Sequence, residues 1–456
     1  MWEKQEMQSR EGRLGTLEKQ ESQVGQKSKK FQKKQVSHQN QPNQVKQVNK
    51  VNQQNQQNQQ NQQNQQSQQS QQSQQSQQSQ CKEGNHQKHG YSEIDTRRYD
   101  RQMRVRNIGQ DGQEKLCSSR IAIVGMGALG CMLAQHLVRS GVGYVRLIDG
   151  DTVELSNLQR QLLYDEADAA VCKPKVIAAA DKLSCINSQV ELSAIFTELH
   201  AWNARELLAD IDLILDGSDR MDTRLLLNDV SLKLDIPWIY GGVVRDEGMY
   251  AVFQPSRTIC FRCLFASHGW ESHACRTQGV LSPAVAVTSS YQAMEAIKLL
   301  TGATDAVTPY AHYFSMWEDF RYRIDLRQDG KEQRMVCKCA QRDHEKVEME
   351  AELIHRGGLA VPELDVRLLC KQGKVQITSL RPLTLNLQEL AEQLASKGVI
   401  ELNRYRLRFR PGSMTVQLTF FFDGRVFMDG LSDLEEARQL YLRYVGQHAG
   451  RSESTG

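Results

Sequence analysis

The sequence predicts an α/β protein built around a doubly wound, Rossmann-like, mostly parallel sheet. Two observations carry this prediction. Short apolar runs alternate with helical segments between Tyr99 and about Leu326, and a glycine-rich turn joins the first of these runs to a helix. Apolar strands spaced by helices are typical of a parallel sheet that is covered on both faces. We also predict a small α+β module at the C-terminus and a disordered tail at the N-terminus.

The strands and helices of the main domain follow one another in order. "RIAIVG" (120–125) is a β-rich run, and an apolar-periodic helix follows through Leu129, Leu133 and Leu137. "YVRLID" (144–149) is the next strand, and "VELSAIF", "IDLILD" and "IPWIYGG" are further strands separated by helical segments. A long helix, "VAVTSSYQAMEAIKLL", is expected to end at Gly302, because glycine is the usual residue just past a helix C-terminus.

The arrangement of β-rich and helical segments changes after Cys339, and we place a domain boundary near residue 345. The segments "LDVRLLC", "GKVQITS", "RYRLRF" and "VQLTFFFDGRVFMDG" are β-rich, whereas "LQELAEQLAS" and "LEEARQLYLRYVG" are helical. The pair Asp423-Gly424 between two β-rich runs indicates a hairpin. We therefore divide the chain into a tail (1–90), a main domain (91–344) and a C-terminal module (345–456).

The tail is rich in Gln, Asn and Ser. From Asn52 the triplet Asn-Gln-Gln occurs five times, and Ser-Gln-Gln then occurs four times. Such a tract has nothing apolar to bury and is expected to be disordered. A spacer that grew by repeat expansion is the simpler interpretation; an interaction arm prone to coiled-coil formation or aggregation is the alternative.

Charge and composition exclude several classes of protein. The chain has 57 Lys and Arg and 54 Asp and Glu, but the first eighty residues hold 11 basic and 5 acidic ones, which leaves the rest mildly acidic. This balance argues against a nucleic-acid-binding surface. The start "MWEKQEMQSREGR" is not a signal peptide, and no apolar run approaches the roughly twenty residues that a membrane helix needs. Eleven cysteines without an export signal indicate reduced thiols or metal ligands. We expect a soluble, cytoplasmic protein.

The glycine-rich turn predicts a nucleotide site. Gly125, Gly127 and Gly130 form a G-x-G-x-x-G motif between a strand and a helix, where the backbone can approach a phosphate at the helix N-terminus. Asp149 ends the next strand, at the spacing where a carboxylate accepts hydrogen bonds from ribose hydroxyls. The default interpretation of this pattern alone is a dehydrogenase that binds NAD.

The charged residues that follow favour ATP over NAD. "DGDTVELSNLQRQ" places Asn157 and Arg160 after Asp149, and Lys175 comes soon after in "CKPK". Basic side chains beside a glycine loop suit a triphosphate, whose leaving group gains charge. "LDGSD" ends a later strand with Asp216 and Asp219, carboxylates that could hold Mg²⁺ on the phosphates.

These motifs together resemble the ThiF/MoeB family, most closely its long ThiF-type members. The resemblance covers about Tyr99 to Cys339 and rests on "RYDRQMRVRNIGQDGQEKL", "GMGALG", "LIDGDTVELSNLQRQ", "KPKV", "DGSD", "CFRCL", "CRTQGV" and "YQAMEAIKLL". The C-terminal module is similar to the extension of long ThiF-like proteins. The family consists of bacterial relatives of ubiquitin-activating enzymes that adenylate the C-terminus of small ubiquitin-like sulfur carriers.

The resemblance implies a role for each site residue. Asp149 would bind the ATP ribose, Asn157, Arg160 and Lys175 would hold the triphosphate, and Asp219 would bind Mg²⁺ or position ATP. Arg101, in "RYDRQ", would reach across a homodimer into the partner's site. The carrier's Gly-Gly carboxylate would then attack the α-phosphate. One position departs from the family, because Arg220 follows Asp219 where relatives usually have Asn.

The cysteines divide into two groups. Cys260 and Cys263 have the spacing of half a zinc site. The resemblance implies a second pair near the end of the domain, and Cys337 and Cys339 are the candidates, with inert thiols as the alternative. Cys275, in "ACRTQGV", resembles the position of a cysteine that can bond covalently to the activated carrier. Arg276 beside it would lower the thiol pKa and favour nucleophilic attack; a dispensable loop thiol is the alternative.

The leading hypothesis is therefore an adenylyltransferase for a ThiS-type sulfur carrier in thiamine thiazole synthesis. The same chemistry on a MoaD-type carrier for molybdopterin is the near alternative. An NAD-dependent oxidoreductase and a non-catalytic scaffold that kept the fold are alternatives of other classes.

Overall fold

The computed structural model describes residues 96–268, 279–327, 364–369, 373–379, 383–412 and 414–446. Residues 91–456 form one compact unit. The tail (1–90) and the boundary near residue 345 therefore lie outside the described residues. Within the described part of the chain, no helix is long and apolar enough to cross a membrane.

The main domain contains an eight-stranded sheet in the order β3-β2-β1-β4-β5-β6-β7-β8. The first five strands in this order pair in parallel, and the last three are added antiparallel. The predicted fold class is confirmed. The strands are β1 (Arg120–Val124), β2 (Tyr144–Ile148), β3 (Glu191–Ile195), β4 (Leu213–Asp216), β5 (Trp238–Val244), β6 (Glu247–Phe253), β7 (Tyr310–Ser315) and β8 (Phe320–Asp325).

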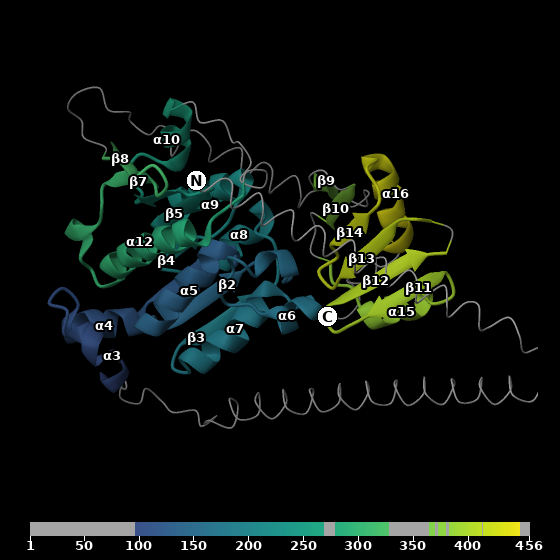
Figure 1. Cartoon of the computed structure of the whole chain (residues 1–456), viewed down its shortest axis with the longest axis horizontal. Helices are drawn as coiled ribbons and strands as arrows, with labels where there is room; N and C mark the ends of the chain where they lie inside the picture. The colour runs from purple at the N-terminus through teal and green to yellow at the C-terminus, as the bar shows by residue number, and fades with distance from the viewer. Residues whose placement is uncertain are drawn as a thin grey trace, which may run out of the picture. The chain divides into compact units, whose positions relative to one another are not determined.

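Helices cover both faces of this sheet (Figure 1). They are α3 (Thr96–Met103), α4 (Gly109–Ser118), α5 (Ala128–Ser140), α6 (Glu166–Ala170), α7 (Lys175–Ile186), α8 (Ala201–Leu208), α9 (Met221–Leu234), α10 (Phe261–His268) and α12 (Ser282–Leu300), with short 3₁₀ turns η1 (Leu155–Asn157) and η2 (Thr304–Ala306). Helix α12 lies beside α5 and ends before Gly302, whose φ is +82°. The predicted end of this helix is confirmed.

Strand β1 is apolar after Arg120 because both of its faces are buried. Ile121 and Ile123 belong to the core shared with α5, α7 and α12, whereas Ala122 and Val124 belong to the core on the opposite face, with α8, α9 and α10. Successive side chains of a strand point to opposite faces, so a strand covered on both sides needs apolar residues at every position.

The strand order reverses at β1, which pairs with β2 on one side and β4 on the other. The loops that leave the carboxyl ends of these strands therefore diverge and open a crevice. Ligands of open α/β sheets bind at such a switch point. The topology therefore predicts a ligand site at the turns after Val124, Ile148 and Asp216.

Strands β6, β7 and β8 were not predicted from the sequence. These strands end the sheet, and every residue of β8 from Phe320 to Arg323 is exposed. An exposed edge strand lacks the continuous apolar pattern of the buried strands, which was the signal used to find them.

The C-terminal module is a six-stranded antiparallel sheet in the order β11-β12-β13-β14-β10-β9. Its strands are β9 (Leu364–Leu369), β10 (Lys374–Ser379), β11 (Gly398–Leu402), β12 (Arg406–Pro411), β13 (Gln417–Phe421) and β14 (Val426–Asp429), and its helices are α15 (Leu387–Leu394) and α16 (Leu434–Tyr444). The predicted hairpin at Asp423-Gly424 joins β13 to β14, and Gly424 has a φ of +81°. The two helices and one face of the sheet share a single core.

The other face of this sheet packs against the main domain. Phe420 lies in the core of the module, whereas its neighbour Phe421 belongs to the core of the main domain, and its ring is 6.1 Å from that of Phe196. In β14, Val426 and Met428 face the module core while Phe427 packs against the main-domain core. The alternation along both strands therefore covers both faces of the sheet.

Candidate active site

The glycine loop leaves β1 and enters α5, and two of its glycines are required by packing. A Cβ at Gly125, whose φ is +91°, would lie 2.7 Å from the carbonyl carbon of Gly217, and a Cβ at Gly130 would lie 1.9 Å from the carbonyl oxygen of Gly125. A Cβ at Gly127 would meet no atom closer than 3.8 Å. The space in front of the α5 N-terminus is therefore open to a ligand phosphate, which the free N–H groups of a helix N-terminus attract.

Asp149 ties this loop to the turn that follows β2. Its Oδ2 accepts a hydrogen bond from the Met126 N–H at 2.6 Å, and its Oδ1 accepts one from the Asp151 N–H at 2.6 Å. Burial raises the pKa of the Asp149 carboxyl, although the charge of Lys175 and the two backbone donors oppose this shift. Each oxygen of a carboxylate keeps a further lone pair, so binding to a ribose hydroxyl remains compatible with these bonds.

Lys175 is a buried cation at the start of α7. Its side chain is 7% exposed, and its Nζ donates to Asp151 Oδ2 at 2.9 Å. Burial alone would lower the lysine pKa, but the nearby Asp151 and Asp149 carboxylates outweigh it and raise the pKa. Lys175 therefore stays charged beside the glycine loop, where a bound phosphate would compete with Asp151 for it.

Asn157 and Arg160 lie on the same connection, between β2 and α6. Asn157 ends η1, and its Oδ1 accepts a hydrogen bond from the Glu154 N–H at 3.2 Å. Arg160 is partly exposed, and its Nη1 donates to the Ser156 carbonyl at 3.0 Å. These hydrogen bonds are local to the connection and do not reach Lys175, so the role of both side chains at the phosphates stays a prediction.

The two aspartates after β4 have different environments. Asp216 is fully buried; its Oδ2 accepts from Arg224 Nε at 3.0 Å, and its Oδ1 accepts from the Ser218 N–H at 2.9 Å and Oγ at 2.6 Å. Its oxygens already bind these interior donors, so Asp216 orders the turn after β4, and a role in holding Mg²⁺ stays a prediction. Asp219 is exposed, next to the turn whose Gly217 contacts the glycine loop.

Arg101 is not brought to this crevice within its own chain. It is exposed on α3, a helix anchored by the Tyr99 hydroxyl, which accepts from Asn187 Nδ2 at 2.9 Å. Asn187 follows α7 and precedes β3. Helix α3 therefore lies near the amino end of the parallel strands, whereas the glycine loop lies at their carboxyl end.

A known protein family matches the part of the chain that contains the candidate site. The model of the ThiF family matches residues 99–339. The chain belongs to the ThiF family.

Relatives differ in how much of this ThiF-family chain they match. The sulfur carrier protein ThiS adenylyltransferase of Bacillus subtilis is 34% identical over 352 residues, which covers 77% of this chain and 100% of the relative. The molybdopterin-synthase adenylyltransferase of Escherichia coli is 39% identical over 248 residues, 54% of this chain and 98% of the relative. A crystal structure of E. coli MccB with ATP matches with a TM-score of 0.43 and 22% identity, over 50% of this chain and 69% of that chain.

Two residues beside the glycine loop were not predicted from the sequence. Gln161 is buried, its Oε1 has no hydrogen-bond partner among the described residues, and its Nε2 would lie 3.9 Å from a Cβ at Gly127. Tyr164 donates its hydroxyl proton to the Met126 carbonyl at 2.7 Å and so fixes the glycine loop. Gln161 was within reach of prediction, because it lies one residue after Arg160 in the same motif.

The described residues contain only the first half of the predicted zinc site. Cys260 is buried directly before α10, and Cys263 lies one turn later on that helix. Cys337 and Cys339, and also Cys275, lie outside the described residues. Within the described part of the chain, no group of three or more metal-ligating side chains occurs.

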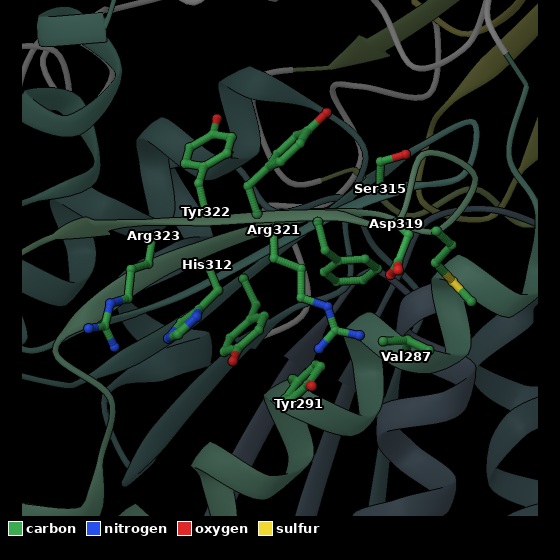
Figure 2. A pocket seen from close by; sticks show the side chains of 12 residues that line it. Val287, Tyr291, His312, Ser315, Asp319, Arg321, Tyr322 and Arg323 are labelled. Carbon is green, nitrogen blue, oxygen red and sulfur yellow. The ribbon is translucent and has the colours of Figure 1, made fainter.

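A cavity of about 530 Å³ lies between α12 and the antiparallel strands β6, β7 and β8. The Tyr250 ring stacks on Tyr291 of α12 at 4.7 Å and on His312 of β7 at 4.8 Å. Figure 2 shows His312, Arg321 and Arg323 on the side of the sheet that faces Tyr291, and Tyr322 on the other side. The cavity thus combines aromatic faces with guanidinium groups.

The glycine loop generates a prediction about two alanine substitutions. We expect Gly130→Ala to lower the free energy of unfolding by about 1–3 kcal/mol, because its Cβ would overlap the Gly125 carbonyl. We expect Gly127→Ala to change the unfolding free energy by no more than about 1 kcal/mol, yet to weaken ATP binding, because its methyl group occupies the open space at the helix N-terminus. Urea unfolding and calorimetric titration with ATP measure the two quantities. Unchanged ATP affinity in Gly127→Ala would place the phosphates elsewhere.

Proposed function

We propose that this protein adenylates the C-terminal Gly-Gly carboxylate of a ubiquitin-like sulfur carrier of the ThiS type, with ATP as the donor. The buried Lys175 cation beside the glycine loop is the observation that carries the proposal, because a triphosphate needs such a charge and hydride transfer to a dinucleotide does not. Similarity over the whole length of the B. subtilis ThiS adenylyltransferase favours a ThiS-type carrier.

The reaction joins the carrier to AMP. A carboxylate oxygen of the carrier attacks the α-phosphorus, the bond to the β-phosphate oxygen breaks, and pyrophosphate leaves with the bonding electron pair. Lys175, Arg160 and Asn157 would bind the triphosphate, and the two basic groups would stabilise the charge that grows on the leaving pyrophosphate. Asp219 would hold Mg²⁺, which screens the phosphate charges. We expect the reaction to take place in the cytoplasm.

A MoaD-type carrier is the second candidate for the substrate. The E. coli molybdopterin-synthase adenylyltransferase has the higher identity, 39%, but the match covers only 54% of this chain. A specific readout is needed to choose between the two carriers, because the adenylation chemistry is the same.

The carrier would dock at the end of the antiparallel strands. Trp317, in the turn between β7 and β8, is 79% exposed, and Phe320, the first residue of β8, is 50% exposed. Exposed apolar side chains gathered at a sheet edge are typical of an interaction surface. Arg321 and Arg323 would attract an acidic carrier surface.

We also propose a homodimer in which Arg101 enters the partner's site. Its exposed place on α3, at the strand ends opposite the glycine loop, leaves it free to act on another chain. An arginine supplied in this way would stabilise the developing charge on the phosphates.

The adenylation proposal predicts that Asp219→Ala abolishes ATP–pyrophosphate exchange, because Mg²⁺ loses its carboxylate ligand. Asp222→Ala is the matched control, since Asp222 lies three residues further on and its side chain is 80% exposed. Wild-type protein is incubated with ATP and either a ThiS-type or a MoaD-type carrier, and mass spectrometry detects the acyl-adenylate. Wild-type exchange in Asp219→Ala contradicts the site assignment, and an adenylate on the MoaD-type carrier alone contradicts the choice of substrate.

A structural zinc ion held by Cys260, Cys263, Cys337 and Cys339 is part of the proposal. Cys260 and Cys263 bracket the first turn of α10, a separation that suits two ligands of one tetrahedral ion. We expect elemental analysis of the purified protein to find roughly one zinc ion per chain. Cys260→Ser should lose it, whereas Cys185→Ser, at an exposed cysteine, should keep it. Zinc retained in Cys260→Ser would assign the metal to other residues.

We propose that Cys275 bonds to the activated carrier after adenylation: its thiolate attacks the acyl carbon of the adenylate, the acyl–phosphate bond breaks, and AMP leaves. We expect Cys275→Ser to keep ATP–pyrophosphate exchange at the wild-type rate and to slow sulfur transfer to the carrier, because the thiol would act only after the adenylate forms. Exchange and thiocarboxylate formation are measured on the same preparations. An equal loss of both would mean that Cys275 supports the fold, and no loss of either would make it dispensable.

A further inference from the structure

Arg425 is a buried arginine of the β13–β14 turn, and two of its guanidinium nitrogens make no hydrogen bond among the described residues, although Nη1 forms an ion pair with Glu198. The residue is 1% exposed, and its Nε donates to Asp423 Oδ2 at 2.6 Å. Nη1 and Nη2 have no hydrogen-bond partner among the described residues, and Glu198 Oε1, at 3.7 Å from Nη1, is beyond hydrogen-bond distance. Unpaired donors on a buried cation cost free energy. The stability of the sheet therefore does not by itself account for this arginine.

The guanidinium of Arg425 lies against the turn that follows β2. A Cβ added at Gly150 would stand 2.4 Å from Arg425 Nη1 and 2.8 Å from Glu198 Cγ. Gly150 is not among the glycines with positive φ in the described chain, so this position needs glycine for space and not for backbone conformation. Its two neighbours are Asp149, which binds the glycine loop, and Asp151, which binds Lys175.

Acidic residues surround Arg425, and one of them, Asp151, belongs to the turn after β2. Burial would lower the arginine pKa, but Asp423, Glu198 and Asp151 outweigh it and raise the pKa. The guanidinium also lies over the ring of Phe196, 5.0 Å from its centroid, which favours a cation at this place. Arg425 is thus a permanent positive charge behind the residues that hold the candidate phosphate site.

Glu198 connects this arrangement to the other wall of the crevice. It accepts a hydrogen bond from Gln376 Nε2 of β10 at 2.5 Å and another from Arg220 Nη1 at 3.3 Å. Arg220 directly follows Asp219 and precedes α9. One carboxylate therefore contacts two elements of the C-terminal module and the residue beside the proposed magnesium ligand, which gives a role to the departure from the family pattern at position 220.

We propose that Arg425 is a positioning residue of the nucleotide site, which holds the Asp149–Asp151 turn from behind so that the C-terminal module contributes to ATP binding. Arg425 acts through Gly150 and Glu198. The inference rests on the proposed function insofar as ATP is the ligand of this crevice. It adds that the β13–β14 turn, far along the chain, forms part of the support of that site.

The first test compares two methionine variants of the full-length protein. Arg425→Met removes the buried guanidinium, and Arg410→Met removes an exposed one from β12 of the same sheet. In calorimetric titration with a non-hydrolysable ATP analogue, we expect Arg425→Met to bind about tenfold more weakly and Arg410→Met to bind as the wild type does. In ATP–pyrophosphate exchange, KM for ATP should rise in Arg425→Met. A merely smaller folded fraction would lower kcat and leave KM unchanged.

The second test is a double-mutant cycle between positions 150 and 425. Gly150→Ala should weaken binding of the analogue, because its Cβ pushes against the guanidinium. Combined with Arg425→Ala, which empties that space, the same substitution should cost less than it does in the wild type. Should an Arg425 variant fail to fold in thermal unfolding, Arg425→Gln, which removes the cation but keeps a polar side chain, replaces it under the same criteria.

Two outcomes overturn the inference: wild-type ATP affinity in a folded Arg425 variant, or strictly additive effects in the cycle. The analogue binds without any carrier, so these measurements do not depend on the choice of carrier. A wild-type protein that does not bind the analogue contradicts the proposed function itself. If the wild type and Arg425→Met bind the analogue with the same affinity, the role of Arg425 is contradicted and the proposed function is not.

Discussion

The hydrogen bonds of the Asp149 carboxylate are the interaction on which the candidate site depends. One oxygen holds the Met126 N–H of the glycine loop, and the other holds the Asp151 N–H of the turn after β2. Two loops from adjacent parallel strands are thereby fixed to each other before any nucleotide binds. Because Asp151 in turn binds Lys175, the position of the buried cation follows from the same carboxylate. A site assembled in advance loses little conformational entropy when its ligand arrives.

Both faces of the sheet in the C-terminal module are packed, and this fixes the module on the main domain. One face carries its own core with α15 and α16, and the other presents Phe421 and Phe427 to the main domain. An apolar contact of this kind places the β13–β14 turn reproducibly, so that a polar residue such as Arg425 can be directed at a particular neighbour. Glu198 then receives hydrogen bonds from both parts of the chain.

Much of this architecture could be predicted from the sequence, and the parts that could not share a physical reason. Strands β1, β2, β4 and β5 were found because both of their faces are buried, and the glycine loop was found because its spacing reflects local geometry. The role of Asp216 was missed, since only the fold reveals that Arg224 occupies its carboxylate. Arg425 was missed because its significance comes from buried nitrogens that make no hydrogen bond among the described residues, which no spacing in the sequence encodes. Cys275, Cys337 and Cys339 lie outside the described residues.

The small size of residue 150 has a consequence for comparisons within the family. The limit on that position comes from Arg425 and Glu198, not from the backbone of the turn. A ThiF-family protein without a C-terminal module has no Arg425 to press on this turn, and a larger side chain could occupy the place of Gly150. The identity of one residue after β2 would then record whether a chain evolved with the module or without it.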